Sequence, residues 1–328
     1  MRHNPEFGGD YAHRPVLWRE VLDFVSRSSI GGEGFMIDAT LGEGGHSELL
    51  LDAFPGISII AFERDPDILD VARVRLKKFG ERIQFINDNF SRMASYLAAK
   101  EGQVGHMLFD FGISSFHYEK SGRGFAYSVD ERLDMRLDGF SGHDAEYIVN
   151  TYREKELADL IYRYGEERWS RRIAAAICRE REKNPIRTTS ALAELVLKAI
   201  PARFHVRNIH PATRVFQALR IEVNDELGSI RTAMKNFWRF MTPGGRMMAI
   251  SFHSLEDRIV KDSFRRLARG CVCDSEMKHC RCLNEPFIKI LTKKPVMAGM
   301  EELQENSRSR SAKMRACERL SGGVPSGI

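Results

Sequence analysis

Three glycines lie within four positions, at Gly42, Gly44 and Gly45, between a short apolar run and an amphipathic stretch in MIDATLGEGGHSELLLDAF (36–54). Glycine in such a place costs conformational entropy, which indicates that something must approach the backbone closely. Glu63 ends the next apolar run, 21 residues after Gly42, and an acid there can bind both ribose hydroxyls of a nucleoside. The loop and the acid together predict a nucleoside cofactor, and a tight strand–helix turn without a ligand is the alternative.

The residues around this loop indicate which cofactor it holds. The dinucleotide fingerprint G-x-G-x-x-G is incomplete, because Ser47 stands where the third glycine would be. Asp38 precedes the loop and Asp110 ends a later apolar run. Neither acid would help to hold a pyrophosphate, whereas both suit the amino group and the sulfonium of S-adenosylmethionine. Methyl transfer is therefore predicted, with a nicotinamide oxidoreductase as the alternative.

The elements that must position these residues alternate along the chain. Five near-continuous apolar runs predict buried parallel strands, at 34–41, 57–63, 83–88, 106–112 and 246–253. Helical stretches at 47–54, 67–79 and 91–100 separate the first four, which predicts a doubly wound α/β sheet. Two further strands are expected within 286–296 and 311–320. Because a loop rather than a helix joins them, they are expected to form an antiparallel hairpin. This arrangement is typical of class I S-adenosylmethionine-dependent methyltransferases, which have a Rossmann-like seven-stranded sheet.

The α/β alternation is interrupted after the fourth strand. The segment 121–207 has no convincing strand, and four helices are expected within 144–152, 155–165, 169–182 and 190–201. Longer helices are expected within 212–241 and 255–270. The prediction is a discontinuous methyltransferase domain, 1–120 and 208–328, interrupted by an all-helical insertion at 121–207 for substrate or RNA recognition.

Composition narrows the class of protein. The 328 residues are 43% apolar and 29% charged, with a net charge of +5. No apolar run approaches the ~18 residues that cross a bilayer, and the N-terminus lacks a signal-peptide core, so a cytoplasmic protein without a membrane partner is expected. Four cysteines, Cys271, Cys273, Cys280 and Cys282, are spaced C-x-C-x6-C-x-C. Four thiolates could close a zinc site, but the usual knuckle spacing is C-x2-C, so no metal is predicted.

Several segments resemble the bacterial 16S rRNA cytosine-N4 methyltransferase family, which acts on cytidine 1402 of the decoding region. They include IDATLGEGGHS, HPATRVFQALRIEVNDEL and PGGRMMAISFHSLEDRIVK, and the resemblance runs from about His13 to Leu320. It implies S-adenosylmethionine as cofactor, a class I fold with a helical insertion, and 16S rRNA in the small ribosomal subunit as partner. A homodimer is also allowed. An RNA-binding ribosome-assembly factor that keeps the fold without the activity stays as an alternative.

The resemblance also assigns cofactor contacts by position. These fall on Gly44, Gly45, His46, Glu63, Phe90 and Asp110, to which the residue pattern adds Asp38 and Gly42. A further contact falls on His117, where the family usually has glutamine, and Phe116 precedes it in place of a common proline.

Methylation of a cytosine amine needs groups that accept its N–H bonds, because the nitrogen lone pair is conjugated into the ring. Asp110, with Ser114 or Ser115, is predicted to supply these acceptors, and Phe116 to stack on the base. A plain polar loop is the alternative. Further substrate or RNA contacts are predicted at His210, Arg214, His253 and Arg258. A helix cap for His253 and a salt bridge to the insertion for Arg214 are the alternatives. Candidate phosphate contacts are Arg168, Arg171, Arg172, Arg308, Arg310, Lys313 and Arg315.

Overall fold

A seven-stranded sheet forms the centre of the molecule. The computed structural model describes residues 14–140, 142–205, 210–271, 273 and 285–322. The strand order is β3-β2-β1-β4-β5-β7-β6, and the strands are β1 (Glu33–Asp38), β2 (Gly56–Glu63), β3 (Ile83–Asn87), β4 (Val104–Asp110), β5 (Met241–Ser251), β6 (Ile288–Ile290) and β7 (Lys313–Arg319). The first five are parallel, and β7 runs antiparallel to both β5 and β6. The predicted sheet and its antiparallel C-terminal pair are confirmed.

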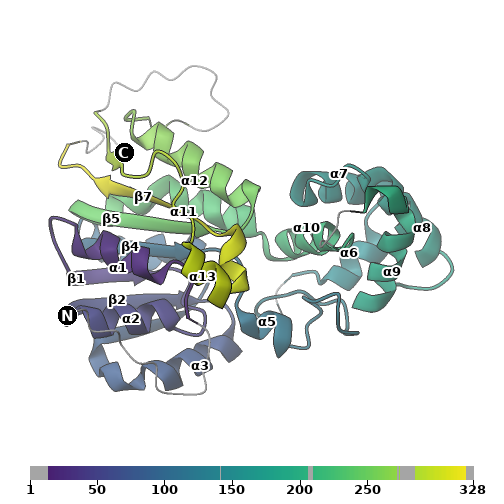
Figure 1. Cartoon of the computed structure of the whole chain (residues 1–328), viewed down its shortest axis with the longest axis horizontal. Helices are drawn as coiled ribbons and strands as arrows, with labels where there is room; N and C mark the ends of the chain where they lie inside the picture. The colour runs from purple at the N-terminus through teal and green to yellow at the C-terminus, as the bar shows by residue number, and fades with distance from the viewer. Residues whose placement is uncertain (1–13, 141, 206–209, 272, 274–284, 323–328) are drawn as a thin grey trace.

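Helices cover both faces of this sheet (Figure 1). One face packs against α1 (Trp18–Ser26), α2 (Gly45–Ala53) and α3 (Pro66–Leu76), and the other against α4 (Met93–Leu97), α11 (Glu226–Phe240) and α12 (Ser254–Leu267). Neighbouring strand residues point to opposite faces, so Leu108 joins the first apolar cluster and Phe109 the second. Burial on both faces explains why these strands are apolar without alternation.

Most of the remaining helices form a separate layer beside the sheet (Figure 1). They are α6 (Ala145–Thr151), α7 (Glu154–Gly165), α8 (Ser170–Arg181), α9 (Thr189–Ala199) and α10 (Thr213–Asn224), with the short α5 (Ser115–Glu119) leading into them. A third apolar cluster fills this layer and extends from Phe125 to Leu219. The helix α10 therefore packs with the insertion, whereas the predicted boundary at 207 assigns it to the methyltransferase domain. The division of the chain into two domains stays a prediction.

Three local features differ from expectation. The segment between β6 and β7 contains a short helix, α13 (Met300–Glu305), where only a loop was predicted. The strand expected within 286–296 is limited to three residues of β6, followed by an isolated bridge from Val296 to Met314. The helix expected at 91–100 is broken into α4 and two 3₁₀ turns. Among the described residues, no helix is long and apolar enough to cross a membrane.

Candidate cofactor and acceptor site

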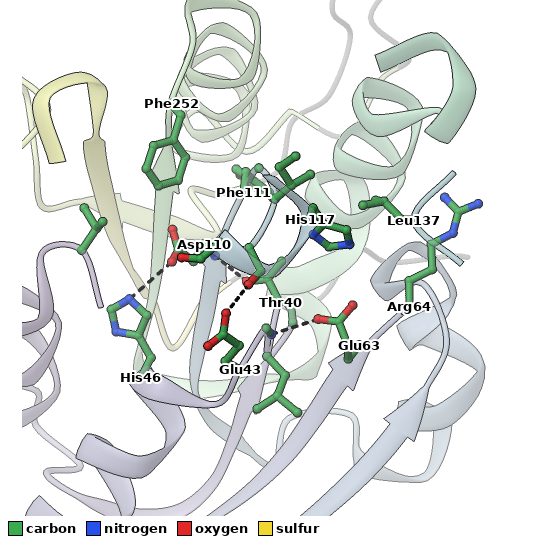
Figure 2. Close-up of a pocket in the computed structure, with 18 of the residues that line it drawn as sticks. Thr40, Glu43, His46, Glu63, Arg64, Asp110, Phe111, His117, Leu137 and Phe252 are labelled. Carbon is green, nitrogen blue, oxygen red and sulfur yellow. Dashed lines mark hydrogen bonds and ion pairs between the residues drawn. The ribbon is translucent and has the colours of Figure 1, made fainter. Parts of the chain in front are cut away.

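A pocket of about 410 Å³ lies at the carboxyl ends of the parallel strands (Figure 2). The strand order reverses between β1 and β4, and ligands bind at such a switch point in open α/β sheets. Side chains that follow β1, β2, β4 and β5 all line this one pocket, among them Thr40, Glu63, Asp110 and Phe252. The sheet topology thus brings together residues that are far apart in the sequence.

The glycine loop lies between β1 and α2 and forms one wall of the pocket. Gly44 has φ +84°, and a Cβ there would lie 2.8 Å from Leu76 Cδ1. At Gly45 a Cβ would lie 2.7 Å from the ring of Pro15. Side chains are therefore excluded at both positions, and Gly42, Gly45 and His46 line the pocket while Gly44 only packs behind it.

Glu63, at the end of β2, binds the glycine loop directly. Its Oε2 accepts a hydrogen bond from the Gly42 N–H at 2.9 Å, and its Oε1 accepts one from the Asp65 N–H at 2.9 Å. Burial raises the pKa of Glu63 to about 7, although these backbone hydrogen bonds act in the opposite direction. A carboxylate oxygen can accept more than one hydrogen bond, so Glu63 keeps capacity for the two hydroxyls of a ribose.

Asp110, at the end of β4, carries the most notable unsatisfied atom of the pocket. Its Oδ2 lies 3.5 Å from His46 Nε2, whereas its Oδ1 is buried without a hydrogen-bond partner among the described residues. The backbone N–H of Asp110 donates to the Thr40 hydroxyl at 2.6 Å, which fixes the end of the strand. Leaving a buried carboxylate oxygen unpaired is costly, which indicates that a donor from a ligand completes this site.

Asp38 does not take the place that the sequence predicted for it. It is 1% exposed and does not line the pocket. Its two oxygens accept hydrogen bonds from the Ser47 hydroxyl at 2.6 Å and the Thr40 N–H at 3.2 Å. Ser47, which replaces the third glycine of the dinucleotide fingerprint, therefore anchors the first turn of α2 to β1 through Asp38.

Phe90 and His117 line the pocket as predicted. The Phe90 ring packs edge-on against Phe109, with centroids 5.7 Å apart. His117 Nε2 lies 3.1 Å from Asp65 Oδ2. Because a carboxylate needs a donor, this contact assigns the proton to Nε2. It leaves Nδ1, which is buried and has no partner among the residues that the structure describes, as an acceptor. Burial lowers the pKa of His117 despite the neighbouring Asp65. The proton that would mimic a glutamine amide is thus already donated to Asp65.

The loop after β4 uses its serines to build local structure. The Ser114 hydroxyl caps α5 by accepting from the Phe116 N–H, and it donates to Glu43 Oε1 at 2.8 Å. The Ser115 hydroxyl accepts from Arg308. Both serines line the pocket, but Phe116 does not, and Tyr118 is the exposed aromatic residue at the pocket instead. A catalytic role for the serines stays a prediction.

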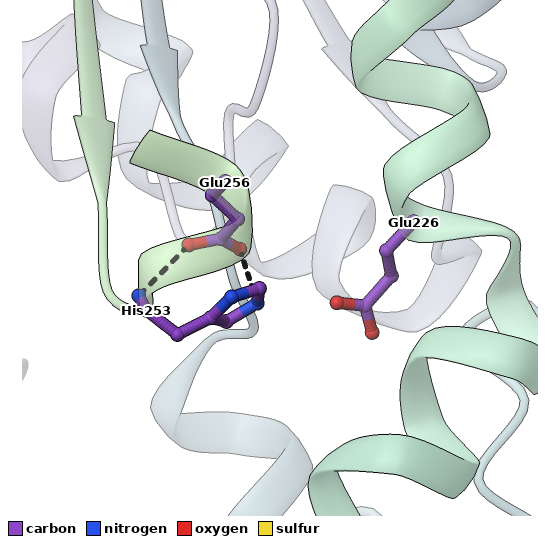
Figure 3. A group of neighbouring side chains, drawn as sticks. All are labelled: Glu226, His253 and Glu256. Atoms are coloured by element: carbon purple, nitrogen blue, oxygen red, sulfur yellow. Dashed lines mark hydrogen bonds and ion pairs between the residues drawn. The ribbon is translucent and has the colours of Figure 1, made fainter. Parts of the chain in front are cut away.

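A charged cluster lies near the ends of β4 and β5. Arg220 on α10 donates to both oxygens of Glu226, with Nε–Oε1 at 2.8 Å and Nη2–Oε2 at 3.0 Å. His253 Nε2 lies 3.2 Å from Glu256 Oε1, and Glu226, His253 and Glu256 offer donor atoms within 4.8 Å of one another (Figure 3). Such a group could hold a cation, but Arg220 already neutralises Glu226, so we interpret the cluster as ion pairs.

Glu256 is buried within this cluster. Burial opposes its ionisation, but the adjacent His253 imidazole and the hydrogen bond from the Phe252 N–H outweigh it and lower the pKa of Glu256. Its Oε2 accepts from the Phe252 N–H at 2.7 Å and from the His253 N–H at 3.2 Å, and the second of these hydrogen bonds caps α12. Glu256 lines the pocket, whereas His253 lies behind it.

The other predicted RNA contacts have protein partners away from the pocket. His210 Nδ1 accepts from the Ala212 N–H at 3.1 Å, and its ring stacks on Tyr127. Arg214 lies 3.5 Å from Glu167 Oε2, so it makes the salt bridge to the insertion that was the alternative. Arg258 lies 3.3 Å from Glu166 Oε1.

The candidate phosphate contacts differ in how far their side chains are exposed. Arg168, Arg171 and Arg172 are exposed on the helical layer, and Arg310 is exposed near the C-terminus. Arg308 lines the pocket, and Lys313 is half-buried. Arg315 is buried and donates to both oxygens of Asp257, at 2.6 and 3.0 Å, so it is not available to a phosphate.

The cysteine motif lies only partly within the described residues. Cys271 and Cys273 are described, whereas Cys280 and Cys282 lie outside the described residues.

Comparison with known proteins identifies the family. The sequence model of the MraW methylase family matches residues 10–320. The chain belongs to the MraW methylase family. It is 47% identical to "Ribosomal RNA small subunit methyltransferase H" of Geobacter sulfurreducens, over 94% of this chain and 99% of that protein. The protein of the same name from Geotalea uraniireducens is 44% identical, over 95% and 99%. Among solved structures, an rRNA methylase from Streptococcus thermophilus matches with a TM-score of 0.42 and 10% identity, over 92% of this chain and 95% of that one.

Membership of this family confirms the resemblance found in the sequence. The residues that line the pocket include some that the sequence predicts and some that it does not. Gly42, Glu63 and Asp110, which are predicted from the sequence, line one pocket. Arg220 and Glu226, which are not predicted, also line it. These two residues belong to the quoted segment HPATRVFQALRIEVNDEL, but no chemical pattern marked them, because the ion pair forms only where α10 turns into α11.

Proposed function

We propose that this chain transfers a methyl group from S-adenosylmethionine to the exocyclic N4 amine of a cytidine in 16S rRNA. The target is cytidine 1402 of the decoding region, and the substrate is the small ribosomal subunit. The observation that carries the proposal is the buried Oδ1 of Asp110, which has no hydrogen-bond partner in the described part of the chain and lies in the same pocket as Glu63 and the glycine loop. The names of the close relatives support the choice of substrate.

The donors and acceptors of the pocket fit the proposed cofactor. Glu63 would accept the two ribose hydroxyls, and the backbone at Gly42 and Gly45 leaves room for a ligand where a side chain would intrude. His46 lines the pocket beside the glycine loop, where its imidazole faces the carboxylate of Asp110. When bound, S-adenosylmethionine supplies a methyl group activated by a positively charged sulfur.

Asp110 is the residue to which we assign the acceptor amine. Its free carboxylate oxygen would accept an N–H of the cytosine amine and orient the nitrogen towards the methyl group. The nitrogen becomes positively charged when it forms the new bond, and a carboxylate stabilises that charge. The same oxygen can then receive the proton that the nitrogen loses. His46, 3.5 Å from the other oxygen, would hold the carboxylate in place.

The alternatives differ in what the pocket binds. A nicotinamide oxidoreductase would bind NAD, and an inactive assembly factor would bind the ribosomal subunit without turnover. Calorimetric titration with S-adenosylmethionine and with NAD separates the first from the proposal. A ribosomal substrate implies a cytoplasmic enzyme. The homodimer stays a prediction that light scattering checks.

The decisive experiment uses the rRNA itself. A strain that lacks this protein should have 16S rRNA without N4 methylation at the target cytidine, as measured by mass spectrometry of the isolated fragment. Purified protein with S-adenosylmethionine should methylate small subunits from that strain, so that the rRNA fragment regains the mass of the methylated form. Normal methylation in the deletion strain would refute the proposal.

A further inference from the structure

Arg220 is a buried cation in the wall of the pocket. Its side chain is 12% exposed and that of Glu226 is 10% exposed. In addition to its two hydrogen bonds to Glu226, it donates from Nη1 to the Tyr118 hydroxyl at 3.2 Å. All three residues line the pocket. Arg220 thus presents a guanidinium of fixed orientation to the cavity.

Arg220 faces the pocket from the corner between α10 and α11. Glu63 ends β2, and two strands, β1 and β4, lie between β2 and β5 in the sheet. Arg220 interacts electrostatically with Glu256, which caps the helix that follows β5. Asp110, at the end of β4, lies between these two ends. With the nucleoside of the cofactor at Glu63, the methyl acceptor would lie between Asp110 and Arg220, which line the same pocket.

The charge of Arg220 is not explained by folding alone. A buried ion pair recovers little more than its desolvation cost, so it is weak evidence for a stabilising role. A guanidinium has five N–H bonds, and the contacts to Glu226 and Tyr118 use three of them. The other two, one on Nη1 and one on Nη2, have no acceptor among the described residues.

We propose that Arg220, oriented by Glu226, recognises the N3 and O2 acceptors of the target cytosine while Asp110 accepts from its N4 amine. This inference rests on the proposed function. Cytosine offers a donor at N4 and acceptors at N3 and O2, and the pocket offers the complementary acceptor and donors. Uracil has a carbonyl at position 4 and an N–H at N3, so it would face Asp110 and Arg220 with groups of the wrong kind. Sites that pair polar groups in this way reject the wrong analogue strongly.

Two variants test this assignment. Arg220→Lys keeps the charge but loses the planar arrangement of donors. Glu226→Gln keeps the size but weakens the orientation of Arg220. Both should bind S-adenosylmethionine within about threefold of the wild type, because Glu63 and the glycine loop are unchanged. Their kcat/KM on small subunits should fall about 10- to 100-fold, which is the range for one bidentate base contact.

A matched control separates base recognition from loss of a buried ion pair. Arg246 lies outside the pocket and donates to Glu318 at 3.0 Å with similar burial. Arg246→Lys should leave kcat/KM within about threefold of the wild type. Thermal melting of all variants shows that they are folded.

The direct test removes one acceptor from the base. Small subunits are reconstituted with 16S rRNA that carries 3-deazacytidine, which lacks the N3 acceptor, at the target position. The wild type should lose at least about tenfold in kcat/KM relative to cytidine, and Arg220→Lys should show no such difference. An equal loss in both proteins, or wild-type kcat/KM for Arg220→Lys on cytidine, would overturn the assignment of Arg220. Failure of the wild type to methylate unmodified subunits would instead overturn the proposed function.

Discussion

Glu63 is a half-buried carboxylate that lines the pocket, and desolvation there raises its pKa to about 7. Ribose hydroxyls bind the ionised form better than the protonated form. Affinity for S-adenosylmethionine should therefore fall as the pH drops below about 7, by up to tenfold for each pH unit, and binding should release a proton. Calorimetry between pH 6 and 8 in buffers of different ionisation enthalpy measures both effects.

Glu63→Gln removes the titrating group at the same position. The variant should bind S-adenosylmethionine more weakly at pH 8, because each hydrogen bond to a charged acceptor contributes about 1.5–3 kcal/mol, and its affinity should not change with pH. An affinity equal to that of the wild type would exclude Glu63 from the cofactor site.

Asp110 is expected to act on the acceptor and not on the fold. Asp110→Asn preserves the size of the side chain but replaces one acceptor oxygen by a donor. Loss of a charge-stabilising group in an active site typically costs about 10²–10³ in kcat, and we expect a decrease of that size with little change in melting temperature. Single-turnover methylation of small subunits measures it. Ser114→Ala is the comparison, because the Ser114 hydroxyl contacts Glu43 and α5. Near-normal turnover of Asp110→Asn would place the methyl acceptor elsewhere in the pocket.

A functional residue was predictable from the sequence where it lies at the end of a predicted strand. Glu63 and Asp110 end apolar runs, so the sheet must carry them to its carboxyl edge. Arg220 and Tyr118 were not predictable, because their roles depend on a contact between segments 102 positions apart. Asp38 also ends a strand and was predicted to bind the cofactor for that reason, but its carboxylate accepts a hydrogen bond from Ser47 and does not line the pocket.

Among the elements, α13 has the least obvious role in the sequence and a clear one in the structure. Its Glu302 Oε1 accepts from the Leu17 N–H at 2.8 Å, and Leu17 is the N-cap residue of α1, with φ +55°. Glu302→Ala should lower the free energy of unfolding by about 1.5–3 kcal/mol, because the acceptor of this hydrogen bond is lost. The midpoint of urea denaturation reports the change.

The neighbouring Glu301 provides the control for this measurement. It pairs with Arg19 at 2.6 Å, but both side chains are largely exposed. An exposed pair contributes about 0.2–1 kcal/mol, so Glu301→Ala should be the milder change. Equal effects of the two substitutions would show that the contact to Leu17 does not stabilise α1.

The strands were predictable and the short helices were not, for a physical reason. Burial on both faces makes β1, β2, β4 and β5 nearly continuous apolar runs, which is a strong local signal. The six residues of α13 are one methionine, one leucine, three glutamates and one glutamine. They therefore show little hydrophobic periodicity. Their position depends on contacts with α1, such as that of Glu302, which local sequence does not encode.

At the scale of the whole molecule, the helical layer is joined to the sheet through α10. A deletion of 121–207 would expose Val215, Phe216 and Leu219, which the insertion buries. The boundary at 207 was predicted from the absence of strands in 121–207, and this absence does not reveal which layer a following helix packs against. Surface substitutions are therefore a better probe of the layer than its removal.

Arg171 and Arg172 are the substitutions that probe it. Both are exposed at the start of α8, and neither pairs with an acidic side chain in the described part of the chain. A protein that positions RNA through phosphates releases counterions, and each phosphate contact contributes about 0.7–0.9 to the slope of log K against log salt. The double variant Arg171→Ala/Arg172→Ala should weaken binding to small subunits and reduce that slope by about 1.5, while calorimetry shows unchanged affinity for S-adenosylmethionine.

The control is the double variant Arg153→Ala/Lys183→Ala. It removes two exposed cations of the same layer that are paired with Glu156 and Glu180, and it should leave the slope unchanged. An equal decrease in both double variants would mean that the layer attracts RNA only through its overall charge, and no decrease in either would place the phosphate contacts outside this layer.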